Sequence, residues 1–200
     1  SIREVLTEAG YDANVVQLAA DTASSPVTMD YLTSEAVDLI DFTGSAAFGE
    51  TVREHSRGRP VFTVEAGVNP VVVAGTDRFK GLTQNLAMSL SLYSGQMCTA
   101  PQTIFVPERG VETDDGRKSP QEVGEGIARA GDKLLSDQAR AMAVLGAVQN
   151  PATLVRVKAA EAAGTVLRRS APVEGSGEAR TATPAIIAVD ADATVWREEC

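Results

Sequence analysis

The sequence has few cysteines, few histidines and no long apolar segment. Its 200 residues include 2 Cys and 1 His, so neither a disulfide scaffold nor a zinc site of Cys and His ligands can be built, and we expect no metal. No apolar run approaches the roughly 20 residues of a membrane span, and the first residues do not resemble a signal peptide. We therefore expect a cytoplasmic protein without membrane association.

Basic residues are also scarce. The chain carries 18 Lys and Arg against 27 Asp and Glu, which gives a net charge of −9. Nucleic acids and anionic membranes are bound through basic patches, so we expect neither as a partner. The apolar content of 44% is sufficient for a folded core.

The clearest local pattern is a strand, a turn, a helix and a second strand. Residues 37–42 are rich in strand-forming side chains, Ser45 suits the N-cap of a helix over 46–56, and residues 61–64 form the next strand. This order within about 30 residues predicts a right-handed βαβ unit with parallel strands.

The remaining chain alternates between helical and strand patterns, which predicts an α/β fold. The expected helices are 1–9, 79–93, one or two within 121–142, and 151–163, with a short helix or a turn over 27–34. The expected strands are 15–18, 71–74, 103–106, 166–167 and 185–189. Residues 107–119 and 172–180 are polar and are expected to be loops.

Cys98 is the first candidate for chemistry. It lies in a polar, turn-prone segment between a helix and a strand. A thiol there can be exposed and close to backbone N–H donors, which lower a thiol pKa and stabilise an oxyanion. The alternative is a buried structural cysteine, because free Cys is among the most buried residue types.

Glu65 is the second candidate, because it ends a strand directly before Ala66 and Gly67. Ligand sites of parallel sheets open at the carboxyl ends of strands, and desolvation there is expected to raise the Glu65 pKa toward a range useful for a general base. The alternative is a solvent-exposed glutamate at a strand end.

Gly44, Ser45 and Gly49 form the third candidate. A glycine turn that leads into a helix N-terminus offers N–H groups and the positive end of the helix dipole to a phosphate. The spacing differs from the dinucleotide-binding fingerprint, so a tight turn with close helix packing is the alternative.

Three segments then occur in a fixed order: Phe42-Thr43-Gly44-Ser45, Val64-Glu65-Ala66-Gly67 and Gly95-Gln96-Met97-Cys98. Glu65 follows Ser45 by 20 residues, Cys98 follows Glu65 by 33, and Glu198-Glu199 comes at the end. This arrangement resembles the aldehyde dehydrogenase superfamily over nearly the whole chain. The Gly-Gln-Met-Cys-Thr variant is most similar to the branch associated with phenylacetic acid degradation, although Val68 and Met97 depart from the usual residues.

The resemblance implies a fold and a set of roles. Residues 1–66 would be the C-terminal part of a parallel-sheet dinucleotide-binding domain, and residues 67–200 part of a parallel α/β catalytic domain. Cys98 would be the nucleophile and Glu65 the base that activates water. The cofactor, NAD or NADP, would contact the following residues: Thr43, Gly44, Ser45, Gly49, Ala66 and Glu199.

The implied reaction is the oxidation of an aldehyde, free or CoA-linked, by a cytoplasmic homo-oligomer. Two alternatives remain, namely transfer of the acyl group to CoA, and an inactive fragment or degenerate homologue with only a binding or assembly role. The resemblance places an oxyanion-hole Asn and a ribose-binding Lys before Ser1, and a Phe after Cys200. We therefore expect the chain to be an internal part of a longer protein.

Overall fold

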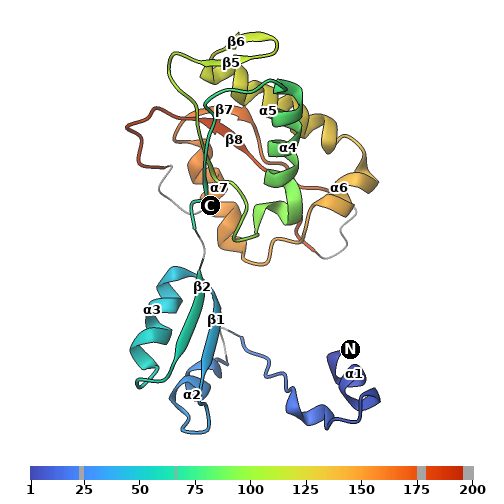
Figure 1. The fold of residues 1–200 in the computed structure, drawn as a ribbon, viewed down its shortest axis with the longest axis vertical. Helices are drawn as coiled ribbons and strands as arrows, with labels where there is room; N and C mark the ends of the chain where they lie inside the picture. Colours follow the sequence, from blue (N-terminus) through green and yellow to red (C-terminus); the bar gives the residue numbers. More distant parts are fainter. Residues whose placement is uncertain (23–24, 66, 175–178, 196–200) are drawn as a thin grey trace. The chain divides into compact units, whose positions relative to one another are not determined.

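The computed structural model describes residues 1–22, 25–65, 67–174 and 179–195 (Figure 1). The chain divides into two compact units, Ser1–Glu65 and Ala66–Cys200. Each unit contains helices and a parallel strand pair, which confirms the α/β class.

The first unit contains the predicted βαβ arrangement. Strands β1 and β2 pair in parallel, with Gly44 beside Glu65 at their ends. Helix α3 packs on one face of the pair, and its Val52 is completely buried with Leu32 and Ile40. In chain order the elements of this unit are α1 (Ile2–Glu8), a 3-10 helix (Ala13–Val15), α2 (Thr28–Thr33), β1 (Ile40–Gly44), α3 (Ala46–His55) and β2 (Val61–Glu65).

The strand expected over residues 15–18 is wrong. The Asp12 side chain accepts a hydrogen bond from the Asn14 N–H at 2.9 Å and caps a 3-10 helix instead. Leu18, the last residue of the expected strand, is 94% exposed. A run of strand-forming side chains does not form a strand where it has neither a partner strand nor a core to cover.

The second unit is larger and begins with a parallel pair, β3 and β4. Its elements in chain order are β3 (Pro70–Val72), α4 (Phe79–Ser91), a 3-10 helix (Leu92–Gly95), β4 (Thr103–Phe105), β5 (Val111–Thr113), β6 (Gly116–Lys118), α5 (Pro120–Leu134), α6 (Gln138–Val144), α7 (Pro151–Glu161), β7 (Thr165–Arg168) and β8 (Ile186–Ala188). The expected helical region 121–142 is therefore two helices, of which α5 begins at a Ser119 capping box.

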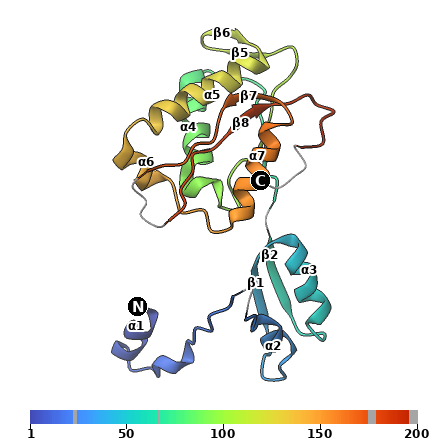
Figure 2. The ribbon, with the colours of Figure 1, turned by 180° about the vertical axis from the view of Figure 1, so that it is seen from behind.

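Helices α4 and α5 pack against each other and supply most of the core of the second unit. Val123 and Ile127 of α5 are buried with Leu86 of α4, and the apolar side chains of β3 and β4 cover this cluster. Gly126 permits the close approach, because a Cβ there would lie 3.0 Å from the Phe79 ring. In Figures 1 and 2, strands β7 and β8 lie along α5, which they also contact.

Residues 107–119 are not the expected loop. They contain an antiparallel hairpin, β5–β6, in which Val111 is 1% exposed. Gly110 and Gly116 adopt positive φ angles of 78° and 80°, which glycine accepts without steric cost. The sequence of this segment shows no alternating apolar pattern, because Val111 is the hairpin side chain that is buried in the core.

The β7–β8 pair is antiparallel as well. The expectation of parallel strands therefore holds for β1–β2 and β3–β4 and is wrong for β7–β8, while the β5–β6 hairpin stands where a loop was expected. Within the described ranges, none of the helices combines the length and the apolar character that a membrane crossing requires.

Candidate active site

Cys98 follows a sharp change in backbone direction at the end of α4. Tyr93, Ser94 and Gly95 have consecutive positive φ angles of 52°, 57° and 70°. Left-handed backbone is unfavourable for the first two residues, so it persists only where the surroundings hold it. Ser94 supplies one such contact, because its hydroxyl donates to the Gly146 carbonyl at 2.8 Å. The Cys98 residue itself is exposed, unlike a buried structural cysteine.

Gln96 fixes the same loop from a second direction. Its Nε2 donates to the carbonyls of Tyr93 at 2.9 Å and Ala147 at 2.8 Å. Its Oε1 accepts from the Gln149 N–H at 2.9 Å. Gln96 lies two positions before Cys98. Its side-chain amide therefore joins the left-handed turn to a segment about 50 residues further along the chain.

Asn69 holds the Cys98 residue itself. Its Nδ2 donates to the Cys98 carbonyl, and its own carbonyl accepts from the Gln102 N–H at 3.3 Å. Asn69 lies directly before β3, so the strand fixes one side of the loop. The orientation of the Cys98 backbone is thus determined by contacts far away in sequence.

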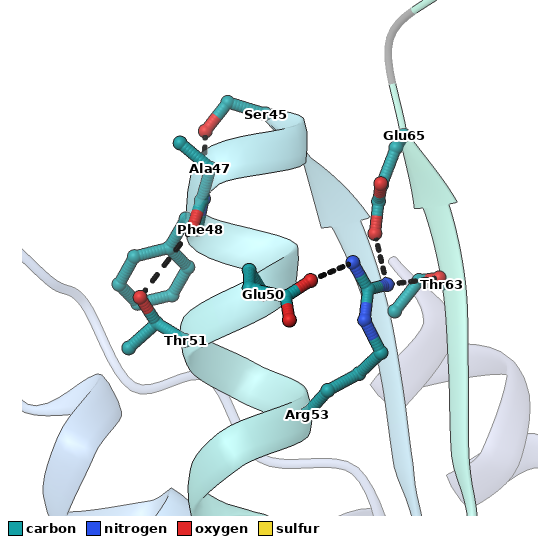
Figure 3. A network of polar contacts seen from close by, with 8 residues as sticks. All are labelled: Ser45, Ala47, Phe48, Glu50, Thr51, Arg53, Thr63 and Glu65. Atoms are coloured by element: carbon teal, nitrogen blue, oxygen red, sulfur yellow. Dashed lines mark hydrogen bonds and ion pairs between the residues drawn. The ribbon is translucent and has the colours of Figure 1, made fainter.

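Glu65 is the last residue of β2, and its carboxylate is paired with Arg53 of α3 (Figure 3). The Arg53 guanidinium also donates to Thr63 at 3.2 Å and to Glu50 at 2.8 Å. The hydrogen bond from Arg53 lowers the pKa of Glu65, and this effect exceeds the opposing effect of desolvation. The expectation that desolvation raises this pKa is therefore wrong.

Gly49 explains how close the Glu65 side chain comes to α3. A Cβ at Gly49 would lie 2.2 Å from Oε1 of Glu65. The carboxylate therefore lies directly over the helix, above the one position in the first two turns that has no side chain. Gly49 is buried in this arrangement.

The other candidate cofactor residues lie at the start of α3. Thr43 and Gly44 end β1, and the Ser45 hydroxyl accepts from the Phe48 N–H at 3.3 Å as the helix cap. Ser45 is exposed, and the first turn of α3 contains no acidic residue. An exposed helix N-terminus whose first turn has no acidic residue of its own fits a phosphate group, although the Glu65 carboxylate lies over Gly49 at the end of that turn.

The predicted site residues divide between the units. Thr43, Gly44, Ser45, Gly49 and Glu65 share the first unit, and Cys98 belongs to the second. Convergence of Glu65 and Cys98 on one reacting carbon stays a prediction.

Two further predicted site residues, Ala66 and Glu199, lie outside the described residues. Among the residues that the structure does describe, no three His, Cys, Asp or Glu side chains gather as metal ligands would.

Sequence reasoning assigned no role to Arg53, Asn69 or Gln96. The position of Arg53 could have been inferred from the sequence, because residues four apart lie on the same face of a helix and Arg53 follows Gly49 by four. Asn69 and Gln96 carry no such signal, because their partners are backbone groups 29 and about 50 residues away.

Comparison with known proteins gives the same family for the whole chain. A sequence model of the aldehyde dehydrogenase family matches residues 1–200. The structure of an NAD-dependent aldehyde dehydrogenase from Burkholderia multivorans is similar with a TM-score of 0.80 and 44% identity. That match covers 92% of this chain and 33% of the Burkholderia chain.

Curated relatives match over shorter ranges. The 4,4'-diapolycopene-4,4'-dial dehydrogenase of Cytobacillus firmus is 36% identical over 81 residues, which cover 40% of this chain and 18% of the relative. The alpha-ketoglutarate semialdehyde dehydrogenase of Haloferax volcanii is 33% identical over 109 residues, or 54% and 22% of the two chains. The match thus spans about a fifth of each curated relative. The family match over all 200 residues, with the fold and the motifs at Ser45, Glu65 and Cys98, shows that the chain belongs to the aldehyde dehydrogenase family.

Proposed function

We propose that this chain carries the reacting residues of an NAD- or NADP-dependent aldehyde dehydrogenase that converts an aldehyde to a carboxylic acid. The observation that carries the proposal is the exposed Cys98 residue in a loop held by Asn69 and Gln96. A nucleophile that is both accessible and fixed in position is what covalent catalysis requires.

The chemistry begins at sulfur. The Cys98 thiolate attacks the aldehyde carbon, a C–S bond forms, and the carbonyl electron pair moves to oxygen to give a thiohemiacetal. The Cys98 N–H stabilises this oxyanion, and one such donor contributes about 3 kcal/mol to transition-state stabilisation. NAD or NADP, when bound, accepts the hydride that leaves the carbon, and a thioester remains on Cys98.

Glu65 acts in the second half of the reaction. Its carboxylate takes a proton from water, the water oxygen attacks the thioester carbon, and the C–S bond breaks to release the acid and the thiolate. A thiolate is both a good nucleophile and a good leaving group, so two accessible steps replace one difficult oxidation.

The start of α3 and its neighbours would hold the cofactor. We assign the pyrophosphate to Gly44 and Ser45, with Gly49 permitting the close packing beneath. Thr43 and Ala66 would lie near the nicotinamide, and Glu199 would bind a ribose hydroxyl. The exposed start of α3, whose first turn has no acidic residue of its own, supports this assignment.

The proposed substrate is an aldehyde formed during aromatic-acid breakdown, as in phenylacetate degradation, either free or CoA-linked. The Gly-Gln-Met-Cys-Thr sequence around Cys98 supports this choice. A cytoplasmic setting and a homo-oligomeric assembly belong to the same proposal. Comparing kcat/KM for a free semialdehyde and for its CoA thioester distinguishes the two substrate forms.

Acyl transfer to CoA is the second candidate. The ion pair with Arg53 lowers the pKa of Glu65 and thereby makes it a weaker base toward water. A thiol acceptor needs less help from a base than water does. Measuring the CoA consumed for each NADH formed decides between the two outcomes.

The test of the proposed function uses the protein expressed from its whole reading frame. Cys98→Ala is expected to lower aldehyde oxidation by at least about 1000-fold, because the nucleophile is removed. Cys200→Ala, which changes the other cysteine, is the control and is expected to retain turnover. Glu65→Gln is expected to preserve the first-turnover burst of NADH and to slow steady-state turnover.

Two results would contradict the proposal. The first is unchanged turnover in Cys98→Ala. The second is a folded protein that binds neither NAD nor NADP in calorimetry, which would favour a degenerate homologue.

A further inference from the structure

The Arg53 side chain gathers three polar groups at one edge of the first unit. Its guanidinium contacts Glu50 one turn earlier on α3, and Thr63 and Glu65 on β2 (Figure 3). The Arg53 side chain is 42% exposed and that of Glu65 is 22% exposed, so solvent screens the pair only partly. The contact therefore joins the helix to the end of the strand that carries the proposed base.

The position of Gly49 shows that this contact directs the Glu65 side chain. The carboxylate folds back over α3 into the space that a Cβ at residue 49 would occupy. A glutamate at the end of a strand has several rotamers that point away from the helix, and the ion pair selects the one that lies on it. Exposed ion pairs contribute little to stability, so the main effect of this pair is on position.

We propose that Arg53 is a positioning residue for Glu65: it holds the carboxylate charged and folded against α3, and Glu65 takes a proton from water only when this ion pair opens. The inference rests on the proposed function, in which Glu65 is the base. It goes beyond that function because Arg53, which does not touch the reacting atoms, controls the position and the charge of Glu65.

The charges around Glu65 give the sign of the pH effect. Arg53 and, through it, Glu50 face the carboxylate from α3, while the neighbour on β1 is Gly44, which carries no charge. Arg53 lowers the pKa of Glu65, so the carboxylate becomes protonated only at a pH below its usual range. Removing Arg53 moves this pKa upward, and the acid limb of deacylation moves to higher pH with it.

The experiment compares Arg53→Gln and Arg53→Lys with Arg129→Gln in the complete protein. Arg129 is a matched control, because it is also a helical arginine paired with a glutamate, Glu125, and lies in the second unit. Acyl-enzyme breakdown is followed after the NADH burst across pH. The Glu65 carboxyl resonance is titrated by NMR with labelled glutamate and is identified by its loss in Glu65→Gln.

The expected result has two parts. In Arg53→Gln the Glu65 titration and the acid limb of deacylation both move to higher pH, and the deacylation rate above that limb rises. Arg53→Lys is expected to lie between Arg53→Gln and the parent, and Arg129→Gln to match the parent. An unmoved Glu65 titration in Arg53→Gln, or a lower deacylation rate at every pH, would overturn the inference.

Failure of the proposed function gives a different result. If Glu65 is not the base, Glu65→Gln leaves deacylation unchanged whatever Arg53→Gln does to the Glu65 titration. The two failures are therefore separable in one set of variants.

Discussion

At Glu65, two influences on the pKa act in opposite directions, and their magnitudes decide the outcome. Position at the carboxyl end of a parallel strand led to the expectation that desolvation raises the pKa. The guanidinium of Arg53 has the larger effect and lowers it. A strand-end carboxylate can be located from sequence, but its pKa depends on a helix residue that reaches back toward it.

Gly49→Ala tests the same geometry without removing a charge. The new Cβ would displace the Glu65 carboxylate, which is the end of a flexible side chain and can rotate away. Alanine is favoured over glycine in a helix by up to about 1 kcal/mol, which offsets the lost contacts. We expect the free energy of unfolding to stay within about 1 kcal/mol of the parent, while the Glu65 pKa rises.

Urea denaturation and NMR titration measure the two quantities for Gly49→Ala. Gly10→Ala is an unsuitable comparison because Gly10 has a φ of 83°. Gly81→Ala on α4 is the control, since a Cβ there would meet only Arg78 Cβ at 3.7 Å. A parent-like Glu65 titration in Gly49→Ala would show that the carboxylate does not depend on this close approach.

At the scale of elements, helix α4 begins with a cap from a distant hairpin. Its N-cap residue, Arg78, makes no side-chain capping bond. Instead Asp114, at the tip of the β5–β6 hairpin, accepts from the Phe79 N–H at 2.7 Å. The hairpin that composition alone did not reveal is thus part of the support of α4.

Asp114→Ala is expected to lower the free energy of unfolding by about 1 kcal/mol, which is the usual effect of losing a helix cap. Asp115→Ala removes a neighbouring carboxylate that pairs with Lys118 and is largely exposed, so it is the matched control. Chemical denaturation of both variants measures the difference. Equal losses in the two variants would argue against a capping role for Asp114.

Local signals predicted most helices and the βαβ unit, but not the hairpin or the packing around Cys98. Ser45 caps α3 with a hydrogen bond to a residue three positions away, and such short-range contacts can be inferred from sequence. The β5–β6 hairpin depends on the burial of Val111, and the Cys98 loop depends on Asn69 and Gln96. Those contacts join residues that are far apart in sequence, so the spacing of residues along the chain does not predict them.

At the scale of the whole chain, each unit has its own hydrophobic core. Val52 is buried with Leu32 and Ile40 in the first unit. Ile127 and Val123 are buried with residues of α4 in the second. A large side chain lost from one core is therefore expected to loosen mainly the unit to which that core belongs.

Ile127→Ala is expected to cost about 2 to 5 kcal/mol because it leaves a cavity between α4 and α5. Hydrogen exchange should accelerate most in those two helices, whereas Val52→Ala should accelerate exchange most in α3 and its strands. Val155→Ala, at a position 68% exposed on α7, is the control. Uniform acceleration across both units by either core variant would contradict the assignment of separate cores.

The contacts that hold the Cys98 loop have a consequence for protein engineering. The Cys98 loop, residues 94–98, is not expected to keep its shape when grafted alone into another scaffold, because that shape depends on Asn69 and on the backbone near Gly146 and Gln149. A working transplant must carry all three segments together. Conversely, insertions near residue 147 are expected to disturb the Cys98 loop without changing any residue beside Cys98 in sequence.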